Sequence, residues 1–267
     1  MDDITKTIRS YYDDQTETEW SRIENRPEFL LTCRFLDRYL LPGEKILDIG
    51  GGPGRYALHL AAKGCDVTLF DLSPGNIRFA SARARQQGLS LHTVCGDARN
   101  VDSLVRETFD HVLLMGPLYH IQDEPGRIQA VNSALRILKP GGTLSASFIN
   151  MFAGIIYAMK EQPDIVLDPA EQDFYRTFIE NRSFAGPAFT EAYFARQDEI
   201  LPFMKQFPLK KLHFFGQESI LSPCEQNIMG HSQEVTDEWL NLGRRLCERE
   251  DLLSWSEHLM YIGRKNS

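Results

Sequence analysis

The sequence predicts an α/β fold: a doubly wound, mostly parallel sheet with helices on both faces. Short apolar runs that are typical of strands alternate with helical patterns between residues 45 and 149. The first run passes through a cluster of glycines into a helix, and each of the first two runs ends close to an aspartate. At 267 residues, the chain has room for one such domain with insertions.

The first predicted strand spans residues 45–49, and a helix over 56–63 follows it after a glycine-rich turn. The glycines of the turn are Gly50, Gly51, Gly52 and Gly54. Glycine is needed where the backbone takes a positive φ or lies against a ligand. The amides at the start of the following helix attract anionic groups above the turn. The turn therefore predicts a site for a nucleotide-type cofactor.

The glycine spacing distinguishes between two kinds of cofactor. A dinucleotide fingerprint needs the order G-x-G-x-x-G, and Arg55 stands where its third glycine should be. The chain has instead an acid-x-G-x-G-x-G pattern that begins at Asp48 and ends at Gly54. This pattern resembles the first motif of the class I S-adenosylmethionine-dependent methyltransferases. An ordinary loop is the alternative, because glycine and proline clusters commonly mark turns.

The second predicted strand, 66–71, ends at Asp71. A doubly wound fold places a ribose-binding carboxylate roughly 20 residues beyond its glycine turn, and Asp71 lies there. Such a carboxylate can accept hydrogen bonds from both ribose hydroxyls. The alternative is that Asp71 caps the next helix. Ser73 followed by Pro74 is a better cap and first-turn pair, which predicts that Asp71 is free.

Three further elements follow in the order seen in this family. A strand over 91–94 leads to Asp97, to which the resemblance assigns the adenine amino group, with a turn-forming aspartate as the alternative. A fourth strand, 110–115, precedes a helix, the Lys-Pro-Gly-Gly run 139–142 and a fifth strand, 143–149. The resemblance thereby implies a cofactor-binding set of Asp48, Gly50, Gly51, Gly52, Gly54, Asp71, Leu72, Asp97, Ala98 and Met115.

The resemblance covers residues 40–150 well and implies a Rossmann-like sheet of seven strands, whose last strand is antiparallel and inserts beside the sixth. A helix over 191–207 and strands over 211–215 and 258–263 complete the predicted order. The predicted divisions are an N-terminal helical cap segment (1–41), the S-adenosylmethionine-binding core (42–150), a lid insertion (151–187) and the C-terminal part of the core (188–267). The insertion is apolar and aromatic, which predicts a helical lid over the site; a helical hairpin that extends the core is the alternative.

Four side chains are candidates for contact with the substrate. His120 follows the fourth strand, where the methyl group should emerge, and an ordinary histidine pKa of about 6.5 suits a catalytic base. Tyr119 beside it is a second catalytic candidate, able to orient a substrate or contact a sulfonium. Tyr11 and Tyr12 lie in an N-terminal segment that often covers the cofactor in this family, so the resemblance makes them candidate substrate contacts. The alternatives are core packing and helix capping for the first pair, and anchoring of an amphipathic helix for the second.

Composition argues against several classes of partner. The net charge of −8 opposes binding to a phosphate backbone. No apolar run is long enough to predict a membrane span, and the first residues lack the apolar region of a signal peptide. The five cysteines have no metal-binding spacing, which predicts a reducing, cytoplasmic setting. Since the fourth strand does not end in a carboxylate that could hold magnesium, no metal is expected.

These observations predict a cytoplasmic enzyme that moves a methyl group from S-adenosylmethionine to a small molecule by in-line displacement and leaves S-adenosylhomocysteine. Two alternatives stay open: an RNA or protein acceptor, and a cofactor-binding sensor or subunit without turnover. The sequence does not distinguish a monomer from a homodimer. Glu191 and His231 are further polar groups whose positions the sequence does not fix.

Overall fold

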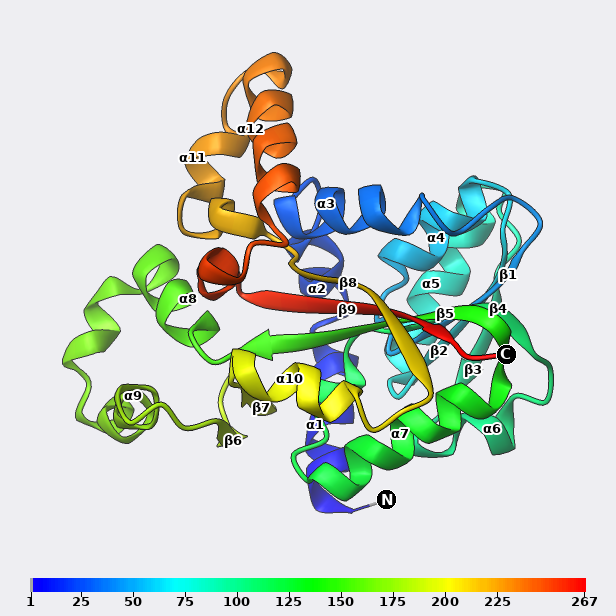
Figure 1. The fold of residues 1–267 in the computed structure, drawn as a ribbon, viewed down its shortest axis with the longest axis horizontal. Helices are drawn as coiled ribbons and strands as arrows, with labels where there is room; N and C mark the ends of the chain where they lie inside the picture. The colour runs from blue at the N-terminus through cyan, green and yellow to red at the C-terminus, as the bar shows by residue number, and fades with distance from the viewer. Residues whose placement is uncertain (1) are drawn as a thin grey trace.

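The computed structural model describes residues 2–267, and a seven-stranded sheet lies at its centre (Figure 1). In spatial order the strands are β3 (His92–Cys95), β2 (Asp66–Asp71), β1 (Lys45–Ile49), β4 (Phe109–Leu114), β5 (Leu138–Asn150), β9 (His258–Lys265) and β8 (Leu209–Gly216). The pairs from β3 to β5 are parallel, whereas β9 runs antiparallel to both β5 and β8. The predicted Rossmann-like order, with its antiparallel last strand, is confirmed.

Helices cover both faces of this sheet and enclose two apolar cores. One face carries α3 (Pro27–Leu36), α4 (Arg55–Ala62) and α5 (Pro74–Gln86), and the other carries α6 (Val101–Leu104), α7 (Glu124–Ile137) and α10 (Gln197–Met204). Successive strand residues point to opposite faces, so Ile46 enters the first core and Leu47 the second. Because both faces are covered, the central strands are almost continuously apolar.

The N-terminal segment is helical, as predicted, and consists of α1 (Asp3–Asp14), α2 (Thr16–Arg22) and α3. The carboxylate of Asp2 caps α1 by accepting a hydrogen bond of 2.7 Å from the Thr5 amide. This helix contacts α5 and the short strand β7 (Glu191–Ala195), which places it across the carboxyl edge of the sheet.

The hairpin of β6 (Phe184–Pro187) and β7 brings the chain to nine strands in one sheet and corrects the prediction of a helix over 191–207. β5 runs past the end of β4, and its last residues, Ile149 and Asn150, pair with β7. The unpaired edge of β5 therefore makes residues 191–195 a strand, and the helix α10 begins only at Gln197.

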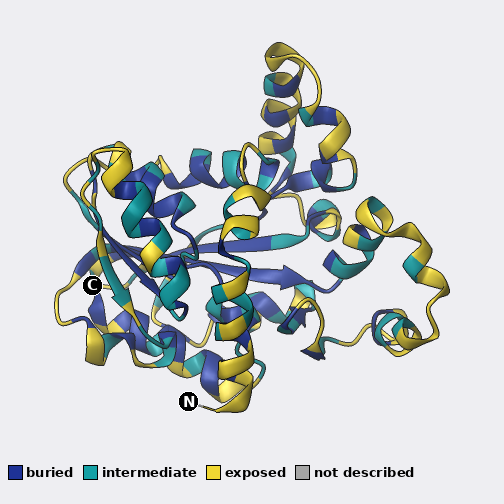
Figure 2. Cartoon of the chain, turned by 180° about the vertical axis from the view of Figure 1, so that it is seen from behind, coloured by how far each residue is buried: buried dark blue, intermediate teal, exposed yellow. Residues whose placement is uncertain are grey.

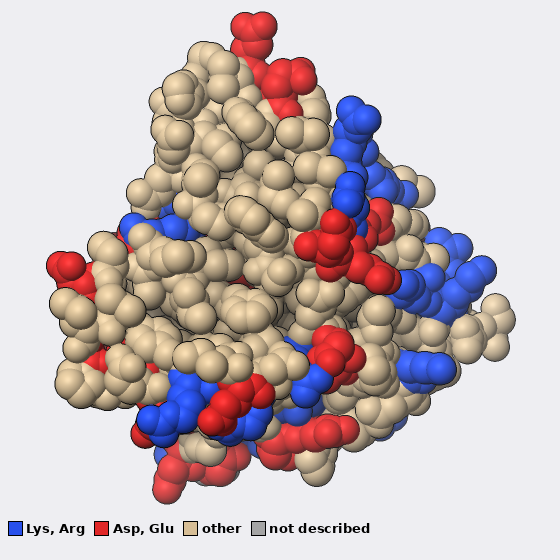
Figure 3. Space-filling view, turned by 60° about the vertical axis from the view of Figure 1, so that its left-hand side comes forward, with Lys and Arg blue, Asp and Glu red and all other residues tan. Residues whose placement is uncertain are grey.

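The insertion between β5 and this hairpin contains α8 (Ala153–Glu161) and α9 (Gln172–Ile179), joined by the 3-10 turns η3 (Pro163–Leu167) and η4 (Pro169–Glu171). These elements extend away from the sheet on the left of Figure 1. Exposed apolar side chains of this segment include Tyr157, Met159, Val166, Leu167 and Ile179, and Phe189 is exposed in the turn of the hairpin. Figure 3, which brings this side forward, shows a broad face with few charged atoms.

A second helical group follows β8 and packs on α3. It consists of η5 (Ser219–Cys224), α11 (Glu225–Met229), α12 (Gln233–Leu246) and η6 (Glu250–Trp255). Figure 2 shows buried residues concentrated in the sheet and exposed residues on α12 and the insertion. Across residues 2–267, no helix is both long and apolar enough to cross a membrane.

Candidate functional site

A cavity of about 410 Å³ opens at the carboxyl ends of the parallel strands. Two short 3-10 turns, η1 (Ala98–Asn100) after β3 and η2 (Pro117–Tyr119) after β4, complete the edge around it. We call one part the glycine end; it is lined by Asp48, Gly50, Gly51, Gly52, Asp71, Leu72, Asn76, Asp97, Ala98 and Met115. We call the other part the histidine end; it is lined by Tyr12, Glu19, Arg22, Glu28, Tyr119, His120, Ser147 and Gln217.

The glycine turn has the backbone conformation that its sequence requires. Gly50, Gly52 and Gly54 have φ values of 73°, 56° and 89°, which residues with a Cβ rarely adopt. A Cβ on Gly50 would lie 2.4 Å from Cδ of Pro117, so the turn packs directly against η2. Gly54 caps α4 and packs against Ala80. It does not line the cavity, although the sequence predicted that it contacts the cofactor.

Asp48 is a fully buried carboxylate at the end of β1, and neither of its oxygens has a hydrogen-bond partner. Burial, followed by repulsion from Asp71, raises the pKa of Asp48 to about 7. A Cβ on Gly51 would lie 2.5 Å from the Asp48 Oδ2 atom, so only glycine fits above this carboxylate. Buried polar atoms are rarely left unpaired, and this pair of oxygens points to a missing donor.

Asp71 lines the cavity but is not free, which corrects the prediction. Its Oδ2 accepts from the Gly52 amide at 2.8 Å, and its Oδ1 accepts from the Ser73 amide at 2.8 Å and from Asn76 Nδ2 at 3.1 Å. Ser73 does cap the helix, since its Oγ accepts from the Asn76 amide at 3.0 Å. Asp71 thus fixes the glycine turn to the start of α5, and a carboxylate with about four lone-pair sites keeps capacity for a further donor.

The Asp97 carboxylate accepts hydrogen bonds from Arg99, two residues later in the chain. The Arg99 Nε donates to both carboxylate oxygens at 3.0 Å, and the Arg99 amide donates to Oδ1 at 2.9 Å. The same guanidinium reaches α1, where its Nη2 lies 3.2 Å from Asp2 Oδ2 and 2.9 Å from Thr5 Oγ1. Asp97 therefore both lines the glycine end and holds the start of α1 over it.

The far end of α1 is held by Asp13, whose Oδ1 accepts from Ser73 Oγ at 2.6 Å and from the Gly75 amide at 2.7 Å. This docking brings Tyr12 into the cavity wall. Tyr11 does not line the cavity; its ring packs edge-on against Tyr12 and Phe189. Of the two substrate contacts predicted on α1, Tyr12 therefore lines the cavity and Tyr11 does not.

His120 is buried between two hydrogen-bond partners. Its Nδ1 lies 2.9 Å from the Glu191 carbonyl oxygen on β7, and its Nε2 lies 2.7 Å from the Tyr12 hydroxyl on α1. Burial lowers the pKa of His120 to about 4, so the expectation of an unperturbed value is wrong. Tyr119 also lines the cavity, and burial raises the pKa of its hydroxyl well above the usual range.

Several polar groups of the histidine end were not predicted. Arg22 donates from Nε to Glu19 and from Nη1 to Glu28, each at 3.0 Å. Ser147 Oγ donates to Gln217 Oε1 at 2.5 Å. These residues come from α2, α3, β5 and the end of β8, and no local pattern marks them. Glu191 contributes through its backbone, and His231 lies exposed between α11 and α12, outside the cavity lining.

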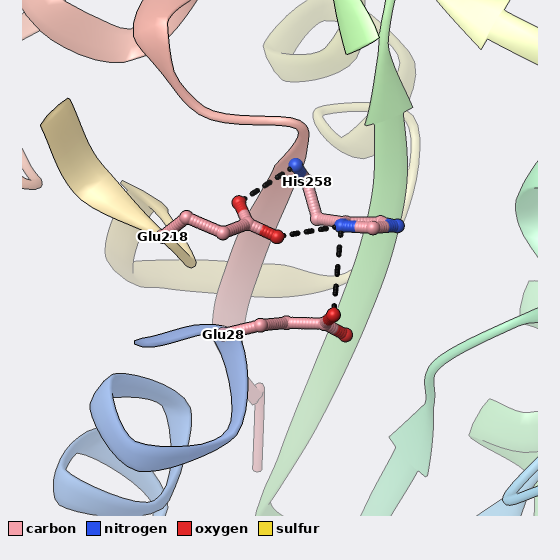
Figure 4. Close-up of side chains that lie close together, drawn as sticks. All are labelled: Glu28, Glu218 and His258. Carbon is pink, nitrogen blue, oxygen red and sulfur yellow. Dashed lines mark hydrogen bonds and ion pairs between the residues drawn. The ribbon is translucent and has the colours of Figure 1, made fainter. Parts of the chain in front are cut away.

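Glu28 also belongs to a charged group with Glu218 and His258 (Figure 4). The His258 Nδ1 lies 2.7 Å from Glu218 Oε1 and 3.9 Å from Glu28 Oε2. Burial opposes a charge on His258, but the two glutamates outweigh it and raise the histidine pKa to about 9. One potential ligand atom from each residue lies within 4.8 Å of the others. Glu28 is already paired with Arg22, and Glu218 is already paired with the protonated His258.

Comparisons with known proteins agree with this geometry. Residues 46–142 match a family described as "Methyltransferase domain". The ubiquinone biosynthesis O-methyltransferase of Psychrobacter cryohalolentis is 34% identical over 188 residues, which are 66% of this chain and 68% of that protein. The corresponding protein of Chromobacterium violaceum is 29% identical over 45% of this chain, and the match spans about half (51%) of its length.

A solved structure shares the fold across nearly the whole chain. The N-methyltransferase NodS from Bradyrhizobium japonicum, in complex with S-adenosyl-L-homocysteine, has a TM-score of 0.56 and 15% sequence identity. The alignment covers 96% of this chain and 99% of NodS.

Proposed function

Because the chain belongs to the class I S-adenosylmethionine-dependent methyltransferases, we propose that it methylates a small molecule at the histidine end of the cavity. The observation that carries the proposal is one continuous cavity with two different walls. In one part, the unpaired carboxylate of Asp48 and the hydrogen-bonded carboxylate of Asp71 lie beside the glycine turn. In the other part, Tyr12 and His120 form a hydrogen-bonded pair.

The glycine end fits the cofactor that the family uses. The unpaired Asp48 oxygens offer acceptors for an ammonium group, and Asp71 offers remaining acceptor capacity for ribose hydroxyls. Leu72, Ala98 and Met115 supply apolar contacts for the adenine ring, with Asp97 beside them. Gly51 and Gly52 let the backbone approach the ligand. Gly54 supports the turn from outside the cavity, and Tyr11 supports Tyr12.

Bound S-adenosylmethionine supplies an electrophilic methyl group. The remaining contribution of the chain is to align the acceptor and exclude water, and alignment alone can supply roughly 7–11 kcal/mol. Tyr12, Tyr119 and His120 line the part of the cavity where the acceptor would lie, and α1 supplies one of its walls. The tyrosine rings also favour a cationic sulfonium nearby.

A small acceptor is favoured because the cavity lining holds no unpaired cation among the described residues. Arg22, Arg55 and Arg99 are its basic residues, and each pairs with a carboxylate. A nucleic-acid acceptor would instead need free lysines or arginines to replace counterions on its phosphates. The curated relatives are named for ubiquinone biosynthesis, which also supports a small acceptor.

The proposed reaction uses no metal. The turn after β4 carries Gly116 and Pro117 in place of a carboxylate ligand. In the group of Glu28, Glu218 and His258, a metal would have to displace the proton on His258 and compete with Arg22. Turnover that is unchanged after treatment with EDTA supports this part of the proposal, and activity that returns only with added Mg²⁺ contradicts it.

Titration calorimetry with S-adenosylmethionine, S-adenosylhomocysteine and NAD tests the proposal. We expect micromolar binding of the first two ligands and no binding of NAD, followed by formation of S-adenosylhomocysteine with a small acceptor. Absence of binding would refute the assignment of the glycine end. Binding with turnover only on RNA or protein would refute the small acceptor, and binding without any turnover would favour a sensor.

A further inference from the structure

The hydrogen bonds of His120 determine which ring nitrogen carries the proton. The Glu191 carbonyl oxygen, 2.9 Å from Nδ1, can only accept a hydrogen bond, so Nδ1 must be the donor. In a neutral ring, Nε2 then has a lone pair. The Tyr12 hydroxyl, 2.7 Å from Nε2, must therefore donate its proton to the histidine.

His120 is buried and Tyr12 is partly buried, and the loss of water around both side chains keeps them neutral. Burial lowers the pKa of His120 and raises the pKa of Tyr12 well above its ordinary value. The Tyr12 oxygen still has lone pairs after it donates to Nε2, and both residues line the histidine end. The pair therefore offers an approaching O–H group one acceptor, with a second acceptor directly behind it.

Resting on the proposed function, we propose that Tyr12 is a catalytic residue and forms with His120 a proton relay for an acceptor hydroxyl. The acceptor class that this relay fits is a phenol or an alcohol. A neutral amine attacks with its free lone pair and needs no base during the attack, so a buried relay would give it no advantage.

The proposed step balances in atoms and charge. The acceptor oxygen forms its bond to the methyl carbon, while the electron pair of the breaking S–C bond stays on sulfur. The acceptor proton moves to the Tyr12 oxygen, and the Tyr12 proton moves to Nε2 of His120. The sulfonium charge disappears as the imidazolium charge forms, so the buried site holds one positive charge before and after the step. Burial opposes the imidazolium in the free protein, whereas the Glu191 carbonyl oxygen and the charge of Glu19 favour it, and the loss of the sulfonium charge removes a nearby positive charge as it forms.

A second tyrosine–histidine pair provides a matched control. The Tyr39 hydroxyl lies 2.6 Å from His213 Nε2, and the His213 Nδ1 lies 2.8 Å from Glu248 Oε1. Neither residue of this pair lines the cavity. Tyr39→Phe therefore removes the same kind of hydrogen bond at a site outside the cavity.

The first test uses ¹⁵N NMR of the histidine rings in the full chain with S-adenosylhomocysteine bound. We expect the His120 proton on Nδ1 and a shift of the Nε2 resonance in Tyr12→Phe but not in Tyr39→Phe. A proton on Nε2, or an unchanged Nε2 resonance in Tyr12→Phe, would overturn the relay. This readout tests the hydrogen-bond arrangement that the relay requires, without an identified acceptor.

The second test measures methyl transfer to a catechol, a simple phenol, an alcohol, a primary amine and a thiol. We expect turnover of a hydroxyl acceptor, with kcat about 100-fold lower in Tyr12→Phe, little change in KM, and unchanged affinity for S-adenosylhomocysteine. Tyr39→Phe should keep kcat within about twofold. Turnover of amines alone, or full activity of Tyr12→Phe, would overturn the relay. If the wild-type chain does not bind the cofactor, the proposed function itself is refuted.

Discussion

The glycine end of the cavity comes from residues 48–98 with Met115, whereas the histidine end comes from segments between residues 12 and 217. In the glycine end, every residue except Asn76 on α5 lies at or just beyond the end of a parallel strand, where the topology itself places it. In the histidine end, α1, α2, α3, η2, β5 and the end of β8 each contribute one or two side chains.

This difference separates what the fold imposes from what the individual chain adds. The strand order holds the glycine end together through the backbone, as in the bond between the Gly52 amide and Asp71. The histidine end is held by side chains that meet across the sequence, as in the bond between Tyr12 and His120. Substitutions should therefore affect cofactor binding at one end and acceptor chemistry at the other.

The largest effect is expected where the two ends touch. Gly50→Ala would place a Cβ 2.4 Å from Pro117 Cδ at a φ of 73°. We expect a loss of about 3 kcal/mol in the free energy of unfolding, from left-handed strain and overpacking together. Gly43→Ala is the matched control, because Gly43 has a φ of 85° with no atom within 4 Å, and it should lose only about 1 kcal/mol. Equal losses in urea unfolding would show that the contact with Pro117 is unimportant.

Asp71→Ala should act on the glycine end alone. It removes the acceptor of the Gly52 and Ser73 amides and the expected ribose contact, so the affinity for S-adenosylmethionine should fall about 100-fold. The affinity is measured by calorimetry, and the ¹⁵N spectrum of His120 should not change. Asp66→Ala, at the exposed start of the same strand, is the control and should bind normally. A mutant at position 71 with wild-type affinity would remove the ribose assignment.

His258→Gln should act near the histidine end and depend on pH. The folded pKa of about 9 lies above the ordinary value of about 6.5, so the charged His258 stabilises the fold fully below pH 6.5. This stabilisation is lost as the pH rises through 9. Between these pH values the wild-type free energy of unfolding should fall by about 2 kcal/mol more than that of the mutant. Parallel pH profiles of the two proteins would contradict the assigned charge.

The smallest expected effect is the release of protons when the cofactor binds at the glycine end. Because the pKa of Asp48 is about 7 in the free protein, this carboxyl is largely protonated at pH 6.5. A bound ammonium group favours the ionised form, so S-adenosylmethionine binding should release roughly 0.7 proton at that pH. Calorimetry in buffers of different ionisation enthalpy measures this release. Asp48→Asn should abolish it, and a mutant that releases as many protons as the wild type would exclude Asp48 as the source.

The sequence was sufficient to predict the parallel strands and the glycine turn, because both depend on local signals. Apolar runs mark β1, β2 and β4, and the spacing from Asp48 to Gly54 marks the turn between β1 and α4. The antiparallel position of β9 followed from the family resemblance. The strand β7 was missed because its pairing depends on the free end of β5, about forty residues earlier in the chain.

The site chemistry was harder to predict, since burial and hydrogen-bond partners are properties of the folded chain. The sequence singled out His120 but could not show that burial would lower its pKa or that Tyr12 would reach its Nε2. It assigned a free carboxylate to Asp71, whose oxygens are in fact shared with the turn and with Asn76. Arg22 belongs to no sequence motif. Only its hydrogen bonds to Glu19 and Glu28 in the folded chain show that it is part of the site.

The docking of α1 has a consequence for the catalytic cycle. Asp2 and Asp13 fasten this helix at the glycine end, and Tyr12 on the same helix completes the histidine end. A movement that lifted this helix would separate Tyr12 from His120 and uncover the glycine end at the same time. The proposed relay is therefore complete only while the helix covers the cofactor site.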